Sequence, residues 1–247
     1  MAMGEADWLM TILTREYGLV RAIAKGARKA TARIGGRIEL LVVNDLQLYK
    51  GRNLDQIFQA DCLRSFRGLS AELSRLAAAQ YLAEAVLLEA TEGQPQEILF
   101  DLLLLHLERL AEATVEQLPA RLVHGIYQLL TISGVAPEVY SCTVSHRPIS
   151  AEAASFSIEG GGLVALECSA VQDMSLRRLD LQQVGALQLL AAEDLPTVSL
   201  EWSVLWMGIE RLLRRYLEFH FDRTIHSADL LDLCFETPSA AMGVPHL

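Results

Sequence analysis

The sequence predicts an α+β protein, in which a small β-barrel or sandwich is followed by an all-helical domain with an irregular insertion. Up to residue 66, short apolar segments alternate with glycine-containing turns, a pattern typical of small barrels and sandwiches. After Gly68 the apolar residues recur at the spacing of an amphipathic helix. The predicted domains are residues 1–68 and 69–235, with the insertion at about 138–175 and a tail at 236–247.

Four strands are expected in the first domain. Residues 8–14 and 19–24 are apolar, and Gly18 in the turn between them can adopt a positive φ. A third strand is expected over 38–49, where Asn44 and Asp45 are candidates for an interruption. A glycine turn then leads to a fourth strand over 55–64.

Helices are expected in the second domain. The first covers 69–88 and ends before Gly93 and Pro95, and the second covers 96–113. Pro119 suits the first turn of a third helix, which ends before Gly134. After the insertion, helices are expected over 181–192 and 200–221, and a frayed tail from residue 237.

Composition excludes several classes of protein. The chain of 247 residues is 51% hydrophobic, which is typical of a globular protein and not of a disordered one. No stretch of 18 apolar residues lacks charged or polar groups, so we expect no membrane span. The N-terminus does not resemble a secretory signal, and the four scattered cysteines form no disulfide framework. We therefore expect a cytoplasmic protein with reduced thiols.

Basic residues are concentrated near the N-terminus. Residues 1–70 hold 11 Lys and Arg against 7 Asp and Glu, whereas residues 71–247 hold 10 against 24. The densest basic stretch runs from Arg15 to Arg37 and contains one acidic residue, Glu16. A basic segment on an acidic protein is a candidate surface for a polyanion. A solvated loop that serves solubility explains it about as well.

Motifs for catalysis are missing from the sequence. The Gly160-Gly161-Gly162 run is followed by no Lys-Ser/Thr pair and is interpreted as a turn. Ser145-His146 and Ser227 lie in no nucleophile elbow. Three acidic residues at helical spacing are interpreted as a solvated face: Glu108, Glu112 and Glu116. The sequence therefore predicts no enzymatic activity.

Two cysteines of the insertion are candidate metal ligands. Cys142, His146 and Cys168 could supply three ligands, but structural zinc takes four, commonly from two C-x-x-C turns. The partner positions are Ser145 and Ala165, and neither can supply a thiolate. We therefore expect no structural zinc and no other cofactor.

A late helix carries a second group of basic residues, Arg211, Arg214 and Arg215. Their simplest role is a solvated face, with Glu210 and Arg214 paired at i,i+4. The alternative is a groove that binds an acidic peptide.

Several segments of the chain are distinctive when taken together. They are Gly4-Glu5-Ala6-Asp7, residues 13–28 (LTREYGLVRAIAKGAR), Gly35-Gly36-Arg37, residues 46–54 (LQLYKGRNL), residues 65–69 (SFRGL) and residues 212–218 (LLRRYLE). These segments resemble the RecO family of bacterial recombination mediators and DNA-annealing proteins. The resemblance is specific over the first 70 residues or so, and diffuse but collinear over the remainder.

The resemblance implies a fold and a function. It implies an OB-fold barrel, then a helical domain with a zinc-ribbon-like insertion. It also implies binding of single- and double-stranded DNA, annealing of complementary strands, and loading of RecA together with RecR on strands coated by single-strand-binding protein. No catalytic residue is implied. A cytoplasmic, nucleoid-associated location follows.

The expected site residues combine the basic pattern with this resemblance. For DNA phosphates they are Arg15, Arg21, Lys25, Arg28, Lys29, Arg33 and Arg37, with Lys50 and Arg52 as outer members. Phosphate contacts are expected to dominate over base stacking, since several of the available aromatics should be core: Trp8, Tyr17, Tyr49, Phe58 and Phe66. For the acidic tail of single-strand-binding protein, the expected residues are those of the late helix. The competing hypothesis is a helical interaction adaptor with a remnant barrel and no DNA binding.

Three departures from the family pattern affect these expectations. The family has a strand before Gly-Glu-Ala-Asp, where this chain has only Met1-Ala2-Met3, so a barrel without its first strand is expected, and a start codon placed too late explains it. Two of the family's four zinc positions are Ser145 and Ala165, so the metal is expected to be lost. The acidic helical domain confines DNA to the barrel side.

Overall fold

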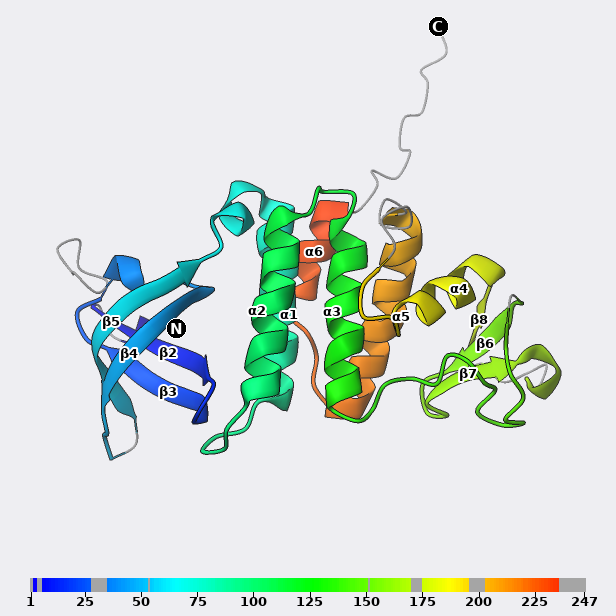
Figure 1. Ribbon diagram of the computed structural model, residues 1–247, viewed down its shortest axis with the longest axis horizontal. Helices are drawn as coiled ribbons and strands as arrows, with labels where there is room; N and C mark the ends of the chain where they lie inside the picture. The colour runs from blue at the N-terminus through cyan, green and yellow to red at the C-terminus, as the bar shows by residue number, and fades with distance from the viewer. Residues whose placement is uncertain are drawn as a thin grey trace, which may run out of the picture.

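The protein consists of a β-sheet, a bundle of helices and a second, smaller sheet, arranged one after another along the long axis (Figure 1). The computed structural model describes residues 2–3, 6–27, 35–52, 54–150, 152–169, 175–195 and 203–235. The predicted α+β class and the order of a β-rich part before a helical part are confirmed. None of the described helices is long and apolar enough to cross a membrane.

Five strands form the N-terminal sheet: β1 (Ala2–Met3), β2 (Asp7–Thr14), β3 (Gly18–Ala24), β4 (Val42–Tyr49) and β5 (Asp55–Ser65). Their spatial order is β1-β2-β3-β5-β4, and β3 runs parallel to β5 while the other neighbours are antiparallel. This is the arrangement of an OB-type Greek key.

The barrel is not closed, in line with the prediction of a barrel without its first strand. Among the described strands, β1 and β4 are the two ends of the order and do not pair with each other. The first strand is present but short, since Ala2 pairs with Trp8 and Met3 with Asp7. Both described residues of β1 pair with β2, and the described strands leave the outer edge of β4 without a partner strand.

Two bulges in β5 decide which side chains face the small core of this sheet. Ile57 and Ala60 are both buried although they are three residues apart. Regular alternation would place them on opposite faces. The register shifts so that Phe58 has no partner between the Leu48–Ile57 and Gln47–Gln59 pairs. A second shift beside Asn44 falls where the sequence predicted an interruption of β4.

Helices α1 (Leu73–Glu89), α2 (Glu97–Glu112), α3 (Leu118–Ile132) and α5 (Ser203–Phe221) form the body. The central helix, α3, packs against the other three, and its apolar residues such as Leu122 and Leu129 are fully buried. Pro119 lies in its first turn, as predicted. A 3₁₀ turn, η2 (Arg67–Ala71), joins β5 to α1.

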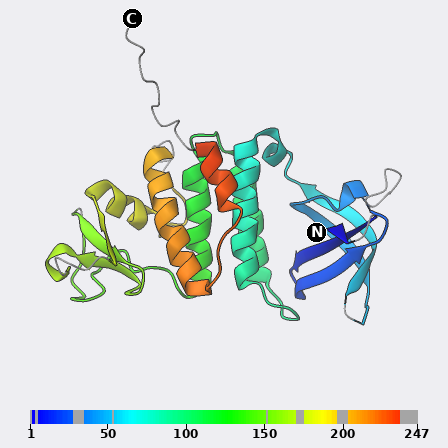
Figure 2. The ribbon, with the colours of Figure 1, turned by 180° about the vertical axis from the view of Figure 1, so that it is seen from behind.

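Two further helices complete the body. α4 (Leu181–Leu189) begins with a capping box formed by Asp180 and Gln183. α6 (Ala228–Phe235) lies beside α1 and can be seen in Figure 2. α6 was not expected from the sequence.

The insertion contains a small antiparallel sheet, which corrects the expectation of an irregular loop in an all-helical domain. Its strands are β6 (Ala154–Ser157), β7 (Gly162–Ala165) and β8 (Leu176–Leu179), in the order β7-β6-β8. Each has four residues, too few to show an alternating pattern. The sheet is fixed to the helices by its core, where the ring of Phe156 meets that of Tyr216 edge to face at 5.6 Å.

The N-terminal sheet is docked to the helical body by backbone hydrogen bonds. Leu19 N donates to Thr91 O at 2.8 Å, and Gln96 N donates to Arg15 O at 2.8 Å. Gly18, with φ at +66°, lies so close that an added Cβ would be 2.2 Å from Thr91 O. Glycine is therefore required at this contact, which places the β2–β3 turn firmly against the α1–α2 loop.

Candidate nucleic-acid interface

The structure divides the predicted phosphate-binding residues into three groups. Arg28, Lys29 and Arg33 lie outside the described residues. Arg15, Arg21 and Arg37 are engaged by carboxylates. The third group is exposed, and within the described ranges no carboxylate lies at ion-pair distance from its members: Lys25, Lys50 and Arg52.

Arg15 and Arg21 face the helical body. Arg15 forms an ion pair with Asp101 of α2, and its guanidinium lies over the ring of Phe100. Arg21, on β3, has its Nε atom 3.5 Å from Glu92 Oε1. These cations are thus compensated by the helical body, although the two arginine side chains are 42% and 61% exposed.

Arg37 attaches the 3₁₀ turn η1 (Gly35–Arg37) to β5. Its Nη1 atom donates to Ala60 O and to Asp61 Oδ1, both at 3.1 Å. Arg37 precedes β4, whereas Lys50 follows it. The Arg37 guanidinium thus lies beside Ala60 and Asp61, which pair with Leu46 and Asp45 of β4, so four or five strand residues, about 14–17 Å, separate it from Lys50. Among the described residues, Arg37 is therefore set apart from Lys50 and is already engaged by Asp61.

A compact cationic and aromatic surface lies at the end of the β4–β5 hairpin. We call it the β4–β5 tip and define it by Tyr49, Lys50, Arg52 and Phe58. The rings of Tyr49 and Phe58 meet edge to face with centroids 5.2 Å apart, and these residues are 61% and 58% exposed. Arg21 lies nearby, because its neighbour Ala22 pairs with Asp55 at the start of β5.

The exposed aromatics contradict the expectation that several of these rings are core. Tyr17 is also exposed, and Phe66 is half-buried with Arg64 over its ring. The apolar spacing of Ile57 and Ala60 was the one signal in the sequence for the outward position of Phe58. The contact between Tyr49 and Phe58 itself could not be predicted from the sequence.

Arg214 of the late helix is not available to an acidic peptide. Its guanidinium binds both carboxylate oxygens of Glu210, at 2.8 and 2.7 Å, and also Asp232, at 2.7 and 3.1 Å. Glu210 is fully buried, and the Arg214 side chain is 15% exposed. Burial opposes the charge of Arg214, yet the hydrogen bonds to Glu210 and Asp232 raise its pKa overall. The predicted i,i+4 pair exists, but it is internal.

The other two arginines of this helix lie on the surface near a third one that the sequence analysis missed. Arg211 is 3.8 Å from Asp232, and Arg215 lines a hollow of about 440 Å³ with Phe219 and Ile158. Burial and the charges of Arg215 and Arg211 lower the pKa of Arg177 on β8. Arg177, Arg211 and Arg215 therefore form a local cluster of positive charge, which we call the arginine cluster.

The residues of the insertion do not fit a zinc ion. The Cys142 sulfur accepts hydrogen bonds from Ser145 N at 3.4 Å and Ala165 N at 3.3 Å. Burial raises the pKa of this thiol, but the bonds from Ser145 and Ala165 outweigh it and lower the pKa to about 6. Serine and alanine stand where two further thiolates would be needed. Within the described part of the chain, no three His, Cys, Asp or Glu residues are grouped to hold a metal.

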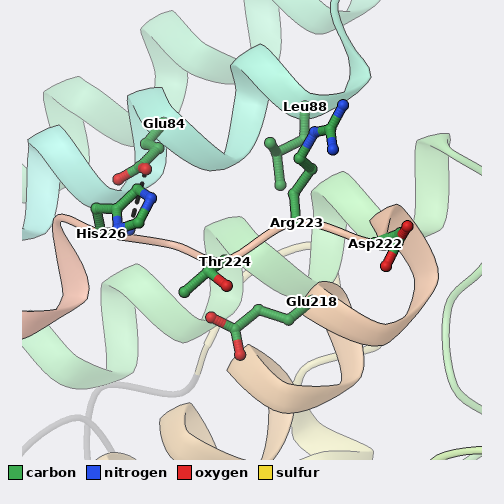
Figure 3. A pocket seen from close by; sticks show the side chains of 7 residues that line it. All are labelled: Glu84, Leu88, Glu218, Asp222, Arg223, Thr224 and His226. Atoms are coloured by element: carbon green, nitrogen blue, oxygen red, sulfur yellow. Dashed lines mark hydrogen bonds between the residues drawn. The ribbon is translucent and has the colours of Figure 1, made fainter.

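A polar hollow of about 550 Å³ lies where the connection from α5 to α6 passes α1 (Figure 3). Its carboxylates serve the fold. Glu84 accepts hydrogen bonds from the backbone N–H groups of His226 and Ser227, at 3.0 and 2.7 Å, ahead of α6. Glu218 accepts one from Ile225 N at 3.0 Å. These groups hold the α5–α6 connection and do not form an acid–base pair.

An OB-type sheet docked on a helical body, with a small sheet inserted in that body, places the chain in the class of two-part proteins with an N-terminal OB-like region. The family described as "Recombination protein O N terminal" matches residues 1–66, and the one described as "Recombination protein O C terminal" matches residues 70–229. The chain belongs to the RecO family, so the resemblance seen in the sequence is confirmed.

Curated relatives named "DNA repair protein RecO" are similar over nearly their whole length. The protein from Gloeobacter violaceus is 66% identical over 244 residues, which cover 98% of this chain and 93% of that protein. The protein from Acaryochloris marina is 41% identical over 278 residues, covering 99% and 95%. Membership of this family supports a role in DNA repair and recombination.

Proposed function

We propose that this protein is a DNA repair and recombination mediator that binds single- and double-stranded DNA through its N-terminal sheet and anneals complementary strands. The observation that carries the proposal is the β4–β5 tip, where two exposed aromatic rings lie beside two cations without carboxylate partners among the described residues. Membership of the RecO family supports the same role.

The tip offers two kinds of contact to a nucleic acid. Lys50 and Arg52 can neutralise phosphates and release counterions, which is independent of sequence. Tyr49 and Phe58 can stack on unpaired bases, which every base permits. Stacking thus contributes more to our proposal than the sequence suggested, and the basic stretch around Lys25 would extend the phosphate contacts.

Annealing follows from weak, exchangeable contacts of this kind. Two DNA strands repel each other, and a cationic surface that screens both lets complementary bases meet. Contacts to phosphate do not occupy the base edges. A strand held in this way therefore remains free to pair.

The proposed function also includes protein partners. We propose that the protein works with RecR to load RecA, and that the arginine cluster binds the acidic tail of single-strand-binding protein. The cluster pairs positive charge with the exposed ring of Phe219, which suits an acidic peptide with apolar side chains. Arg177 replaces Arg214 in this hypothesis.

A second candidate function is an interaction adaptor without DNA binding. It is favoured by the ion pairs that already engage Arg15, Arg21 and Arg37. Fluorescence anisotropy of a short labelled single strand at low salt distinguishes the two. Mediator function predicts binding that Lys50→Ala with Arg52→Ala weakens, while Arg223→Ala, an exposed cation at the far end of α5, leaves it unchanged. No binding by the unaltered protein would favour the adaptor.

A further inference from the structure

We infer that Glu92 and Asp101 of the helical body act as built-in competitors of DNA, by holding Arg21 and Arg15 of the sheet in ion pairs that a bound phosphate chain must displace. The inference rests on the proposed DNA binding and concerns the regulation of the same surface. Neither carboxylate was among the residues expected from the sequence.

The Arg21–Glu92 pair lies near the β4–β5 tip, and the Arg15–Asp101 pair lies further along the β2–β3 hairpin, toward the helical body. β3 and β5 pair in parallel from Ala22 and Asp55 onwards, so Arg21 lies beside the loop that carries Lys50 and Arg52. Arg15 is on the same β2–β3 hairpin, after Thr14, which pairs with Gly18. A strand that leaves the tip toward the helical body therefore reaches Arg21 and Arg15, where it also meets Glu92 and Asp101.

Both ion pairs are exposed to solvent, so another anion can replace the carboxylate on each arginine. The side chains of Arg21 and Glu92 are 61% and 64% exposed, and those of Arg15 and Asp101 are 42% and 55% exposed. Exposed ion pairs of this kind hold weakly and are screened by salt. A phosphate can take the place of either carboxylate on its arginine, since guanidinium groups bind both anions with the same geometry.

The joint between the sheet and the body does not depend on these ion pairs. It is held by backbone hydrogen bonds from Leu19 to Thr91, from Gly93 to Tyr17 and from Gln96 to Arg15. The carboxylates can therefore be neutralised while the two parts stay docked. The helical body would then lower DNA affinity through charge alone, which keeps the contacts exchangeable, as annealing requires.

The test is a double variant, Glu92→Gln with Asp101→Asn, compared with the unaltered full-length chain. Freeing two cations should steepen the log–log salt dependence of single-strand binding by about 1.4, at about 0.7 per phosphate neutralised. Affinity at 0.1 M salt should rise roughly tenfold. The matched control is Glu152→Gln with Glu167→Gln, which makes the same change in net charge at exposed positions of the insertion.

The outcomes separate the inference from the proposed function. A steeper slope and tighter binding in the test variant, but not in the control, support the inference. Equal behaviour of test and control, with the unaltered protein binding DNA, overturns the inference alone. No binding by the unaltered protein at low salt overturns both. If the double variant is unstable by thermal unfolding, Glu92→Gln alone should give half the change in slope, and an unchanged slope in that stable variant overturns the inference equally.

Discussion

Arg214 is bound by Glu210 at two points inside the helical body, where the carboxylate of Glu210 is fully buried between α5 and its neighbours. Asp232 of α6 accepts a further hydrogen bond from the same guanidinium. The Cζ atom of Arg214 lies 5.9 Å from the ring centroid of Tyr81 on α1. One arginine thus ties α5 to α6 and contacts α1, so this part of the late helix serves stability.

Replacing Glu210 with Ala should strongly destabilise the protein, because it leaves a largely buried cation with half of its partners. Breaking a buried pair costs about 3–5 kcal/mol of unfolding free energy. Urea unfolding followed by circular dichroism measures the change. Arg211→Ala, on the same helix but half exposed, should cost less than about 1 kcal/mol. Similar losses in both variants would contradict the structural role of Glu210.

Unfolding free energy should fall in mild acid because of His106. Burial, with the positive charges of His124 and Arg109, lowers its pKa to about 3, from an ordinary value of 6.5. The folded state therefore keeps His106 neutral, and the contribution of His106 to the unfolding free energy is complete above pH 6.5. It declines as pH falls from there toward 3, by at most about 1.4 kcal/mol per pH unit. His106→Leu should flatten this slope, and an unchanged slope between pH 6 and 4 would contradict the assignment.

A zinc site should appear when two thiolates are restored. Ser145 and Ala165 both direct a backbone N–H at the Cys142 sulfur, so Ser145→Cys with Ala165→Cys should assemble four sulfur ligands with Cys142 and Cys168. Titration with Co²⁺ reports tetrahedral thiolate binding by its visible absorption. Ser145→Cys alone should bind far more weakly. Absence of a one-to-one complex in the double variant would show that Cys168 lies too far away.

Binding to single-stranded DNA should weaken with salt at a log–log slope of about −3 to −4, if four to six phosphates are neutralised. Replacing Lys25, Arg28 and Lys29 with Ala should weaken binding to all sequences alike, because phosphates carry no sequence information. Anisotropy titrations on several unrelated oligonucleotides check both points. A loss restricted to one sequence, or a slope near zero, would contradict phosphate binding.

Phe58→Ala should reduce affinity for a single strand by about tenfold, since stacking contributes about 1–3 kcal/mol per base. Affinity for a duplex and the salt slope should change little, because paired bases are not available to the ring. Leu63→Ala, at the other exposed position on β5 that a register shift leaves without a partner, is the matched control. Equal losses on single strands and duplexes would exclude stacking.

The sequence predicted the order of elements well where the signal is local. Gly18 and Gly93 mark turns that the structure contains, and Pro119 marks the start of α3. The strands of the insertion were missed because four residues carry no readable period, and the family resemblance pointed to a metal-stabilised loop. The open barrel was predicted, because the shortness of the first segment is visible in the sequence. The pairing of that segment with Trp8 was not predicted.

The sequence by itself determined the two-part architecture, the asymmetry of charge and the family, because these depend on neighbours along the chain. Only the tertiary structure decided which cations are free. Arg15 and Arg214 look like ordinary basic residues in the sequence, yet Asp101 and Asp232 reach them from segments 86 and 18 residues away. Charges that lie far apart along the chain are brought within a few ångströms by folding, and the strength of their interaction depends on that distance and on the exclusion of water.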